Sequence, residues 1–372
     1  MEEWTRDTPL KVLMTTDTIG GVWSYAIELC RSLKEFNVHF HVVTTGAPMQ
    51  FSQKEEIKAL ENVTVYETDF LLEWMDSPWQ SIDNSGAWLL ELAAEVQPNL
   101  VHLNSYSYGS LNWNAPVIMV AHSDVFSWWL AVKQGYPPVH WNKYFKKVHR
   151  GLQKANLIIA PSKSSLKDIR KIYFGTAPGR VIYNGRDGGL FYPAEKQPVV
   201  CSMGRIWDEA KNIRLLVEAA KKIRCPIRLA GDTSFGNDYC STAGANITNL
   251  GKIAVTQIAA ELSVASIYVL PAKYEPFGLS VLEAALSGCA LVLGNIPSLK
   301  EIWGDSALYI NTNDAAGLAD TVNHLLESDE LRQHYAAMAI ERAKRYSTEA
   351  MAGNYINVYH ELLNTGEPVT ST

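Results

Sequence analysis

Short apolar runs alternate with longer amphipathic segments along the whole chain. The runs are rich in Val, Ile and Leu and end at turn residues, which is typical of buried β-strands. We expect strands at residues 11–16, 40–45, 100–104, 116–122, 157–161, 199–205, 226–232, 246–251, 266–272 and 289–294. Apolar residues recur at helical spacing in residues 22–36, 85–96, 212–223, 256–262, 279–288 and 314–328. This alternation predicts an α/β fold of parallel sheets with helices on both faces.

The strand and helix rhythm occurs twice, which predicts two Rossmann-like domains. A chain of 372 residues also exceeds the size at which a single core stops growing. Turn residues and charges cluster at residues 183–198, so the join should lie there. We expect an N-terminal domain at 1–183, a linker at 184–198 and a C-terminal domain at 199–349.

The last predicted helix begins near residue 348 and has one apolar face. Met351, Tyr355, Tyr359 and Leu362 recur at helical spacing along it. Such a stripe needs a surface to pack on.

Composition and charge narrow the function classes. A net charge of −6 argues against a general nucleic-acid binder, which needs a basic face. No window approaches 18 uncharged apolar residues, and the acidic N-terminal segment lacks the apolar core of a signal peptide. The five scattered cysteines form no Cys-x-x-Cys pair and are interpreted as reduced core thiols. We therefore expect a cytoplasmic protein.

Ligands of open parallel sheets bind beyond the carboxyl ends of the strands. Small, polar and charged residues follow several of the predicted strands. They are Asp17 to Gly21, His122, Gly204 and Arg205, Gly231 and Asp232, Gly251 and Lys252, and Glu275. These positions are the candidates for a ligand site.

Two glutamates flank the predicted start of one helix, in the segment KYEPFGLSVLEAALSG at residues 273–288. The first N–H groups of a helix have no intrahelical partner and attract phosphate, and Gly278 would let a ligand approach the backbone. Glu275 and Glu283 would repel phosphate and should accept hydrogen bonds from hydroxyls instead. A ligand with central phosphates and hydroxyls on each side is a nucleotide sugar. The alternative is that Glu283 is a favourable first-turn acid and Glu275 a loop charge.

A basic pair could neutralise the phosphates. Arg205 follows a strand, and Lys211 lies six residues later beside a predicted helix start. A fixed guanidinium and a mobile ammonium suit a diphosphate. The alternative is a solvated pair beside Asp208 and Glu209.

Taken together, these motifs resemble the retaining GT-B glycosyltransferases of family 4, the glycogen-synthase-like group. The segment EPFGLSVLEAALSG is similar to the E-x7-E motif of that family, and GR…KN, GGVWSYAIEL, APSKSSL, VIYNGRD and FYP follow in the family's order. The resemblance covers nearly the whole chain. It implies two domains facing across a cleft, with the last helix (in 350–372) crossing back to complete the N-terminal, acceptor-binding domain. The C-terminal domain would bind the nucleotide sugar.

The resemblance also assigns roles to individual residues. Glu275 would bind hydroxyls of the donor sugar, and Glu283 those of the ribose. Backbone N–H groups and backbone contacts to the donor would come from Phe277, Gly278, Leu279, Ser280, Gly251, Lys252, Gly20 and Gly21. Arg205 and Lys211 would neutralise the leaving diphosphate. His122 would contact the donor sugar near its 6-hydroxyl.

The chain departs from the family pattern at two places in the first half. Val22, Trp23, Ser24 and Tyr25 follow the paired glycines where many members carry Glu-Arg-His or Glu-Arg-Tyr, so acceptor chemistry could differ. Asn104 stands where a second histidine is common. His102 is interpreted as structural.

We expect no cofactor and no essential metal, because no two aspartates are two positions apart and the basic pair with the helix terminus can supply the electrostatics. The predicted activity is transfer of a hexose from a nucleotide sugar, with UDP-glucose as the first donor to test. The acceptor would be a saccharide or a lipid-linked saccharide of the cell envelope or an exopolysaccharide. Retention of anomeric configuration follows from the resemblance alone. Two alternatives stay open: another enzyme on this scaffold (a nucleotide-sugar epimerase or sugar phosphorylase), or a silent nucleotide-sugar-binding subunit.

Nine of eleven tryptophans lie in the first 150 residues, which suits an acceptor that stacks on aromatic rings. The candidates nearest the strand ends are Trp23, Trp128 and Trp129. Basic residues at 143–150 could rest on the anionic inner surface of a membrane, or they could form a solvated helix face.

Overall fold

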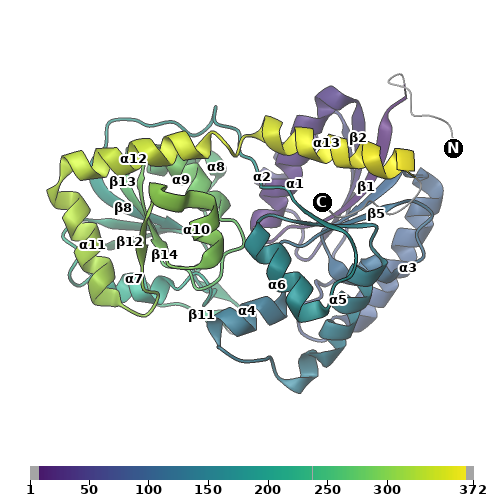
Figure 1. Ribbon diagram of the computed structural model, residues 1–372, viewed down its shortest axis with the longest axis horizontal. Helices are drawn as coiled ribbons and strands as arrows, with labels where there is room; N and C mark the ends of the chain where they lie inside the picture. Colours follow the sequence, from purple (N-terminus) through teal and green to yellow (C-terminus); the bar gives the residue numbers. More distant parts are fainter. Residues whose placement is uncertain (1–7, 237, 366–372) are drawn as a thin grey trace. The chain divides into compact units, whose positions relative to one another are not determined.

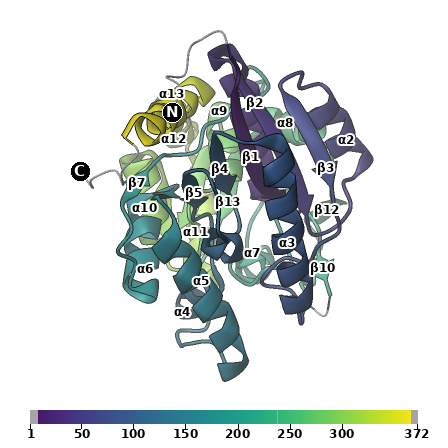
Figure 2. The ribbon, with the colours of Figure 1, turned by 90° about the vertical axis from the view of Figure 1, so that its right-hand side faces the viewer.

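The computed structural model describes residues 8–236 and 238–365, which divide into two units. The first unit holds the chain up to Leu130, Gly135–Gly185 and the part from Thr348 onward. Its parallel sheet has the order β3-β2-β1-β4-β5-β6-β7, which can be followed from β3 to β7 in Figure 2. The strands are β1 (Leu10–Asp17), β2 (Val38–Thr45), β3 (Val63–Glu67), β4 (Leu100–Leu103), β5 (Val117–Val120), β6 (Leu157–Ala160) and β7 (Gly179–Val181).

Helices cover both faces of this sheet, because its central strands are apolar on both sides. Every residue of β4, β5 and β6 is buried. The helices of the unit are α1 (Gly21–Ser32), α2 (Phe51–Lys58), α3 (Trp79–Val96), α5 (Asn142–Lys154), α6 (Lys163–Tyr173) and α13 (Thr348–Thr365), and α4 (Val125–Val132) starts in it. Short 3-10 turns lie at Leu33–Phe36, Tyr106–Ser110 and Val139–Trp141.

The second unit holds Arg186–Ser347 and the short segment Ala131–Gln134. Its six parallel strands have the order β12-β9-β8-β13-β14-β15. The strands are β8 (Gln197–Met203), β9 (Ile227–Ala230), β12 (Ile247–Gly251), β13 (Ala265–Leu270), β14 (Ala290–Gly294) and β15 (Leu308–Ile310), with a hairpin of β10 (Ser234–Phe235) and β11 (Asp238–Tyr239). The helices are α7 (Ile213–Ala219), α8 (Val255–Val264), α9 (Leu279–Leu286), α10 (Pro297–Trp303), α11 (Ala315–Glu327) and α12 (Asp329–Ala343), and a 3-10 turn lies at Gly304–Ser306.

The α/β prediction of two Rossmann-like domains is therefore confirmed. The last helix, drawn in yellow in Figure 1, packs against α1 of the first unit, as expected. Its apolar stripe is buried there, since Met351, Tyr355, Tyr359 and Leu362 are each at most 3% exposed. The predicted bounds of the N-terminal domain (1–183), the linker (184–198) and the C-terminal domain (199–349) stay a prediction.

Some elements are shorter than predicted. The helix expected at 22–36 ends at Ser32 and continues as a 3-10 turn, which Asn37 ends in a left-handed conformation with φ of 54°. The helix expected at 212–223 ends at Ala219. None of the helices in the described part of the chain is long and apolar enough to cross a membrane. All five cysteines are buried and free.

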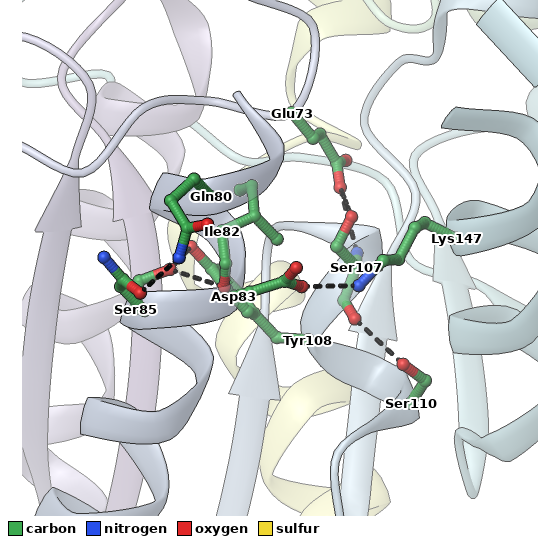
Figure 3. A network of polar contacts seen from close by, with 10 residues as sticks. Glu73, Gln80, Ile82, Asp83, Ser85, Ser107, Tyr108, Ser110 and Lys147 are labelled. Atoms are coloured by element: carbon green, nitrogen blue, oxygen red, sulfur yellow. Dashed lines mark hydrogen bonds and ion pairs between the residues drawn. The ribbon is translucent and has the colours of Figure 1, made fainter. Parts of the chain in front are cut away.

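A buried carboxylate in the first unit is satisfied without any cation. Glu73 is only 6% exposed, and it accepts hydrogen bonds from Tyr106 N (3.2 Å), Ser107 N (2.9 Å) and Ser107 Oγ (2.7 Å). Figure 3 shows this network beside the bond between Ser85 Oγ and Tyr108 Oη, 2.8 Å long. Burial raises the pKa of Glu73. The donors belong to one 3-10 turn, so Glu73 fixes that turn.

Candidate functional site

The start of α9 lies at the carboxyl edge of the second sheet, directly after β13. Gly278 precedes the helix with φ of +90°, a left-handed conformation that favours glycine. The next residue but one, Ser280, has its Oγ 2.8 Å from the Tyr268 hydroxyl, at hydrogen-bond distance. Because α9 begins here, the N–H groups of Leu279 and Ser280 have no preceding helical carbonyl to bond, whereas the Val281 N–H donates to the Gly278 carbonyl over 3.0 Å. This is the geometry that the sequence predicts for a phosphate site.

Glu275 lies in the loop before α9 and is 8% exposed. Its carboxylate forms an ion pair with Lys211 Nζ. Its backbone oxygen accepts a 2.5 Å bond from Ser298 Oγ, which fixes the loop against α10. The side chain of Lys211 is 16% exposed. Lys211 is therefore not a solvated lysine, and the structure brings two predicted site residues together.

Glu283 lies in α9 and is also 8% exposed. Its Oε1 lies 2.9 Å from Nε of Arg186, whose side chain is 6% exposed. Sequence reasoning missed Arg186, because the segment YNGRDGG reads as a turn-rich linker. The available signal was that Arg186 lies within VIYNGRD, one of the segments that follow in the family's order.

The two carboxylates lie near a common hydroxyl. Burial raises the pKa of Tyr268, and the negative charges of Glu283 and Glu275 raise it further. The Tyr268 hydroxyl also donates to the Met203 carbonyl at the end of β8, 3.2 Å away. Tyr268 thus connects the end of β8 to the first turn of α9.

Arg205 follows β8 and is held by two neighbours. Its Nη2 lies 2.9 Å from Asp208 Oδ2, and its guanidinium lies over the Trp207 ring, 5.5 Å from the centroid. Trp207 in turn stacks on Phe235 with ring centroids 5.0 Å apart. The Arg205 side chain is 35% exposed, so it is both oriented and open to solvent.

Glycines let the ends of β8, β9 and β12 approach each other. A Cβ on Gly231 would lie 1.7 Å from the Gly204 carbonyl oxygen, so only glycine fits. The Gly231 N–H donates to the Gly251 carbonyl over 2.8 Å. Lys252 follows Gly251, and it is exposed. The predicted backbone border at Gly251 and Lys252 therefore lies at the same sheet edge as Arg205.

In the first unit, the end of β5 carries a histidine whose tautomer is set by its neighbour. Asn104 Nδ2 donates to the Thr15 carbonyl (2.7 Å), so Asn104 Oδ1 faces His122 Nε2, 2.8 Å away. An amide oxygen only accepts. His122 therefore carries its proton on Nε2, and Nδ1 is left as an acceptor. Desolvation lowers the pKa of His122 to about 3, which keeps the ring neutral.

His102 belongs to a separate, closed network. Its Nδ1 lies 2.7 Å from the Tyr359 hydroxyl and its Nε2 lies 3.1 Å from the Tyr25 hydroxyl. Tyr25 donates to Tyr355 over 2.6 Å. Burial lowers the pKa of His102 to about 3. These contacts join β4 and α1 to α13, in agreement with the structural role expected for His102.

The remaining candidates lie at or near strand ends of the first unit. Gly20 has φ of +93° and precedes α1, which begins at Gly21. Trp23 is 5% exposed and donates to Glu56 over 2.8 Å, so little of its ring is open to an acceptor. Trp128 and Trp129 are half-buried and meet edge to face, 6.0 Å apart.

Two family models match this chain, one on each half. "Glycosyltransferase Family 4" matches residues 19–188, and "Glycosyl transferases group 1" matches residues 197–328. Sucrose-phosphate synthase from Thermosynechococcus elongatus has a similar fold over 95% of this chain and 98% of its own, with a TM-score of 0.80 and 18% identity. The chain belongs to the GT-B glycosyltransferases.

This glycosyltransferase is also similar to two proteins whose names state an activity or a bound ligand. O-antigen chain mannosyltransferase B from Escherichia coli is 28% identical over 251 residues, which are 60% of this chain and 66% of the relative. HepE from Anabaena, solved in complex with UDP-glucose, has a TM-score of 0.76 and 18% identity over 94% of this chain and 99% of its own.

The glycosyltransferase has its charged candidates concentrated in the second unit. Lys211 pairs with Glu275, and Glu283 pairs with Arg186. Arg205 and Ser280 lie at the same sheet edge, on the elements that follow β8 and β13. Among the described residues, no group of three or more His, Cys, Asp or Glu side chains is arranged to hold a metal ion.

Proposed function

We propose that this glycosyltransferase moves a hexose from a nucleotide diphosphate sugar to a saccharide or lipid-linked saccharide. One observation carries the proposal: two buried carboxylates, each paired with a cation, flank the start of α9. Buried charges are costly unless they are paired. A ligand with a diphosphate and hydroxyls on both sides could bind the cations through its phosphates and the carboxylates through its hydroxyls.

In this proposal each group has one role. Glu275 accepts hydroxyls of the donor sugar, and Glu283 accepts those of the ribose. The first N–H groups of α9, at Leu279 and Ser280, bind the diphosphate, with Phe277 and Gly278 beside them. Nδ1 of His122 in the first unit accepts a sugar hydroxyl, since Nε2 is committed to Asn104. Gly20 and Gly21 let the backbone before α1 approach the donor.

The proposed mechanism is stabilisation of the leaving group. As the sugar–phosphate bond breaks, negative charge builds on the diphosphate and the sugar becomes cation-like. Arg205, Lys211 and the helix N–H groups oppose that charge. Lys211 is paired with Glu275, so donor binding would have to share or exchange this ion pair. We propose that configuration is retained, with the acceptor attacking from the face that the phosphate leaves and the phosphate taking its proton. No metal is required for this step.

The finer assignments concern the donor, the biosynthetic role and the two domains. The UDP-glucose complex of HepE makes UDP-glucose the first donor to test. The Escherichia coli relative favours a role in envelope or exopolysaccharide synthesis. We further propose that residues 1–183 with 350–372 bind the acceptor and residues 199–349 the nucleotide sugar, with 184–198 as linker, and that the protein acts in the cytoplasm. Trp128 and Trp129 are the better acceptor candidates, because Trp23 is buried.

We also propose peripheral contact with an anionic membrane through α5. Tyr144, Val148 and Leu152 face the core, and Lys143, Lys146 and Arg150 are exposed. Lys147 is partly neutralised by Asp83, 2.8 Å away (Figure 3). In a co-sedimentation assay, the wild type should bind to vesicles that contain phosphatidylglycerol. A variant with the three exposed residues replaced by glutamine should stay in the supernatant. Equal binding to neutral phosphatidylcholine vesicles would contradict this contact.

A donor panel tests the proposed function. The protein is incubated with UDP-, GDP- and ADP-sugars, with and without saccharide acceptors, and released nucleotide is measured. Nucleotide release that depends on an acceptor supports transfer. Conversion of the donor sugar without an acceptor indicates an epimerase, and phosphate-dependent release of sugar phosphate indicates a phosphorylase. Binding without turnover of any donor indicates a silent subunit.

A further inference from the structure

Arg186 is a deeply buried arginine that no predicted role accounts for. Its side chain is 6% exposed, although arginine is almost never buried without a partner. It is the first residue of the main segment of the second unit, Arg186–Ser347, and it comes before the first strand of that segment. Its position is fixed by the backbone, because its N–H donates to the Tyr346 carbonyl over 3.1 Å.

The guanidinium is aimed at Glu283 and held from a second side. Arg186 Nε lies 2.9 Å from Glu283 Oε1, and the guanidinium carbon lies 5.1 Å from the centroid of the Phe191 ring. Phe191 is itself 2% exposed. A planar guanidinium held between a ring and a carboxylate has little freedom to move, and lysine could not reproduce both contacts.

A buried ion pair is weak evidence for stability, since desolvation offsets most of the attraction. The location of the Arg186–Glu283 pair indicates a role in ligand binding. Glu283 lies in the first turns of α9, next to the helix N-terminus that the proposed function assigns to the diphosphate. A carboxylate has about four acceptor positions, so pairing with one nitrogen leaves capacity for hydroxyls.

We infer that Arg186 is a positioning residue that keeps Glu283 oriented to accept the ribose hydroxyls of the donor nucleotide. This inference rests on the proposed function. Arg186 touches no part of the ligand in this account and acts only through Glu283. Its loss should therefore matter only for nucleotides that carry the hydroxyls.

The test compares a ribonucleoside diphosphate with its 2′,3′-dideoxy analogue by isothermal titration. The nucleotide used is whichever of UDP, GDP and ADP the wild type binds most tightly. Wild type should prefer the ribonucleotide by about 10- to 100-fold, the range for hydrogen bonds to a charged group. Arg186→Met should lose most of that preference while binding the dideoxy analogue as wild type does. Arg186→Lys should fall between the two.

Two controls separate positioning from folding. Arg228 pairs with Glu261 over 2.6 Å in the same unit, and both side chains are less buried. Arg228→Met should keep the full ribose preference. Should Arg186→Met fold poorly, the double variant Arg186→Met with Glu283→Gln removes both charges together; it should fold better and still lack the preference.

The outcomes are distinct. If the wild type prefers the ribonucleotide and Arg186→Met prefers it equally, the inference about Arg186 is overturned and the proposed function is not. An equal loss for both nucleotides means that Arg186 contacts the phosphates directly, and also overturns it. A wild type that binds none of the three nucleoside diphosphates, or ignores the hydroxyls, overturns the proposed role of Glu283 and the inference with it.

Discussion

Glu73 in the first unit and the two glutamates beside α9 in the second unit are buried in opposite ways. In the first unit, Glu73 is satisfied by neutral donors of a single turn. In the second unit, Glu275 and Glu283 are each matched with a cation. A carboxylate surrounded by N–H and O–H donors has its capacity used by the fold. A carboxylate paired with a single cation can still accept hydrogen bonds from hydroxyls. Burial alone therefore does not indicate a functional acid. Burial together with a basic partner, at the edge of a sheet where its strands end, does.

The histidines repeat this contrast within the first unit. His102 has both ring nitrogens committed to tyrosine hydroxyls and is fully buried. His122 has one nitrogen committed to Asn104 and is half-buried at the end of β5. The first holds α13 in place, and the second has Nδ1 left as an acceptor.

The largest effect is expected at Lys211, which would contact the diphosphate. Lys211→Met removes a charge-assisted contact of about 1.5–3 kcal/mol, so the transfer rate should fall about 10- to 100-fold. The pairing with Glu275 adds a second expectation, because the variant leaves a buried carboxylate unpaired and should also melt at a lower temperature. Single-turnover rates and thermal melts measure both effects. A folded variant with an unchanged rate would break the assignment of the charged pair to the diphosphate.

The closed histidine network predicts acid sensitivity of the first unit. His102 has a pKa lowered to about 3, so the folded state binds fewer protons than the unfolded state below the ordinary value of 6.5. Stability should therefore fall as pH drops, by about 2 kcal/mol between pH 7 and pH 5 from this residue. Urea unfolding at both pH values measures the slope. His102→Gln can still donate to Tyr25 and accept from Tyr359, so it should lose this contribution; an unchanged slope would argue against it.

The smallest effect is expected at Glu73. Glu73→Gln keeps one oxygen acceptor but places an amide against a backbone donor, which should cost about 1–2 kcal/mol of stability at most. Burial raises the pKa of Glu73, so this residue destabilises the wild type as pH rises above the ordinary carboxyl range, and the variant should lack that dependence. Nucleotide affinity should not change. A clear loss of nucleotide affinity in titration would remove the contrast between the two units.

Periodicity predicted the fold well where strands are apolar on both faces. The strands β4, β5, β13 and β14 are continuous buried runs, and each was expected within a few residues. The edge strand β3 was missed, because its residues are exposed or half-buried and carry no apolar run. One helix end was misplaced because the apolar periodicity continues through residues 33–36, which form a 3-10 turn and not part of α1.

The site was predicted less completely than the fold. The strand-end rule selected Arg205 and Glu275, and helix-terminus reasoning selected Gly278 and Glu283. Arg186 could not be found this way, because its partner lies 97 positions later in the chain and only the fold joins them. The hydrogen bond between His122 Nε2 and Asn104 could likewise not be predicted from the sequence, because the Thr15 carbonyl orients the Asn104 amide only in the folded protein.

The central claim is that the two paired glutamates hold different parts of one nucleotide sugar. Titration of UDP into Glu275→Ala and Glu283→Ala, beside a transfer assay on both, tests it most directly. Glu283→Ala should weaken UDP and the nucleotide sugar by similar factors, because both carry ribose. Glu275→Ala should leave UDP affinity nearly intact while transfer falls about 100-fold, since a misplaced sugar loses the required alignment. Equal weakening of UDP by the two variants would contradict the claim.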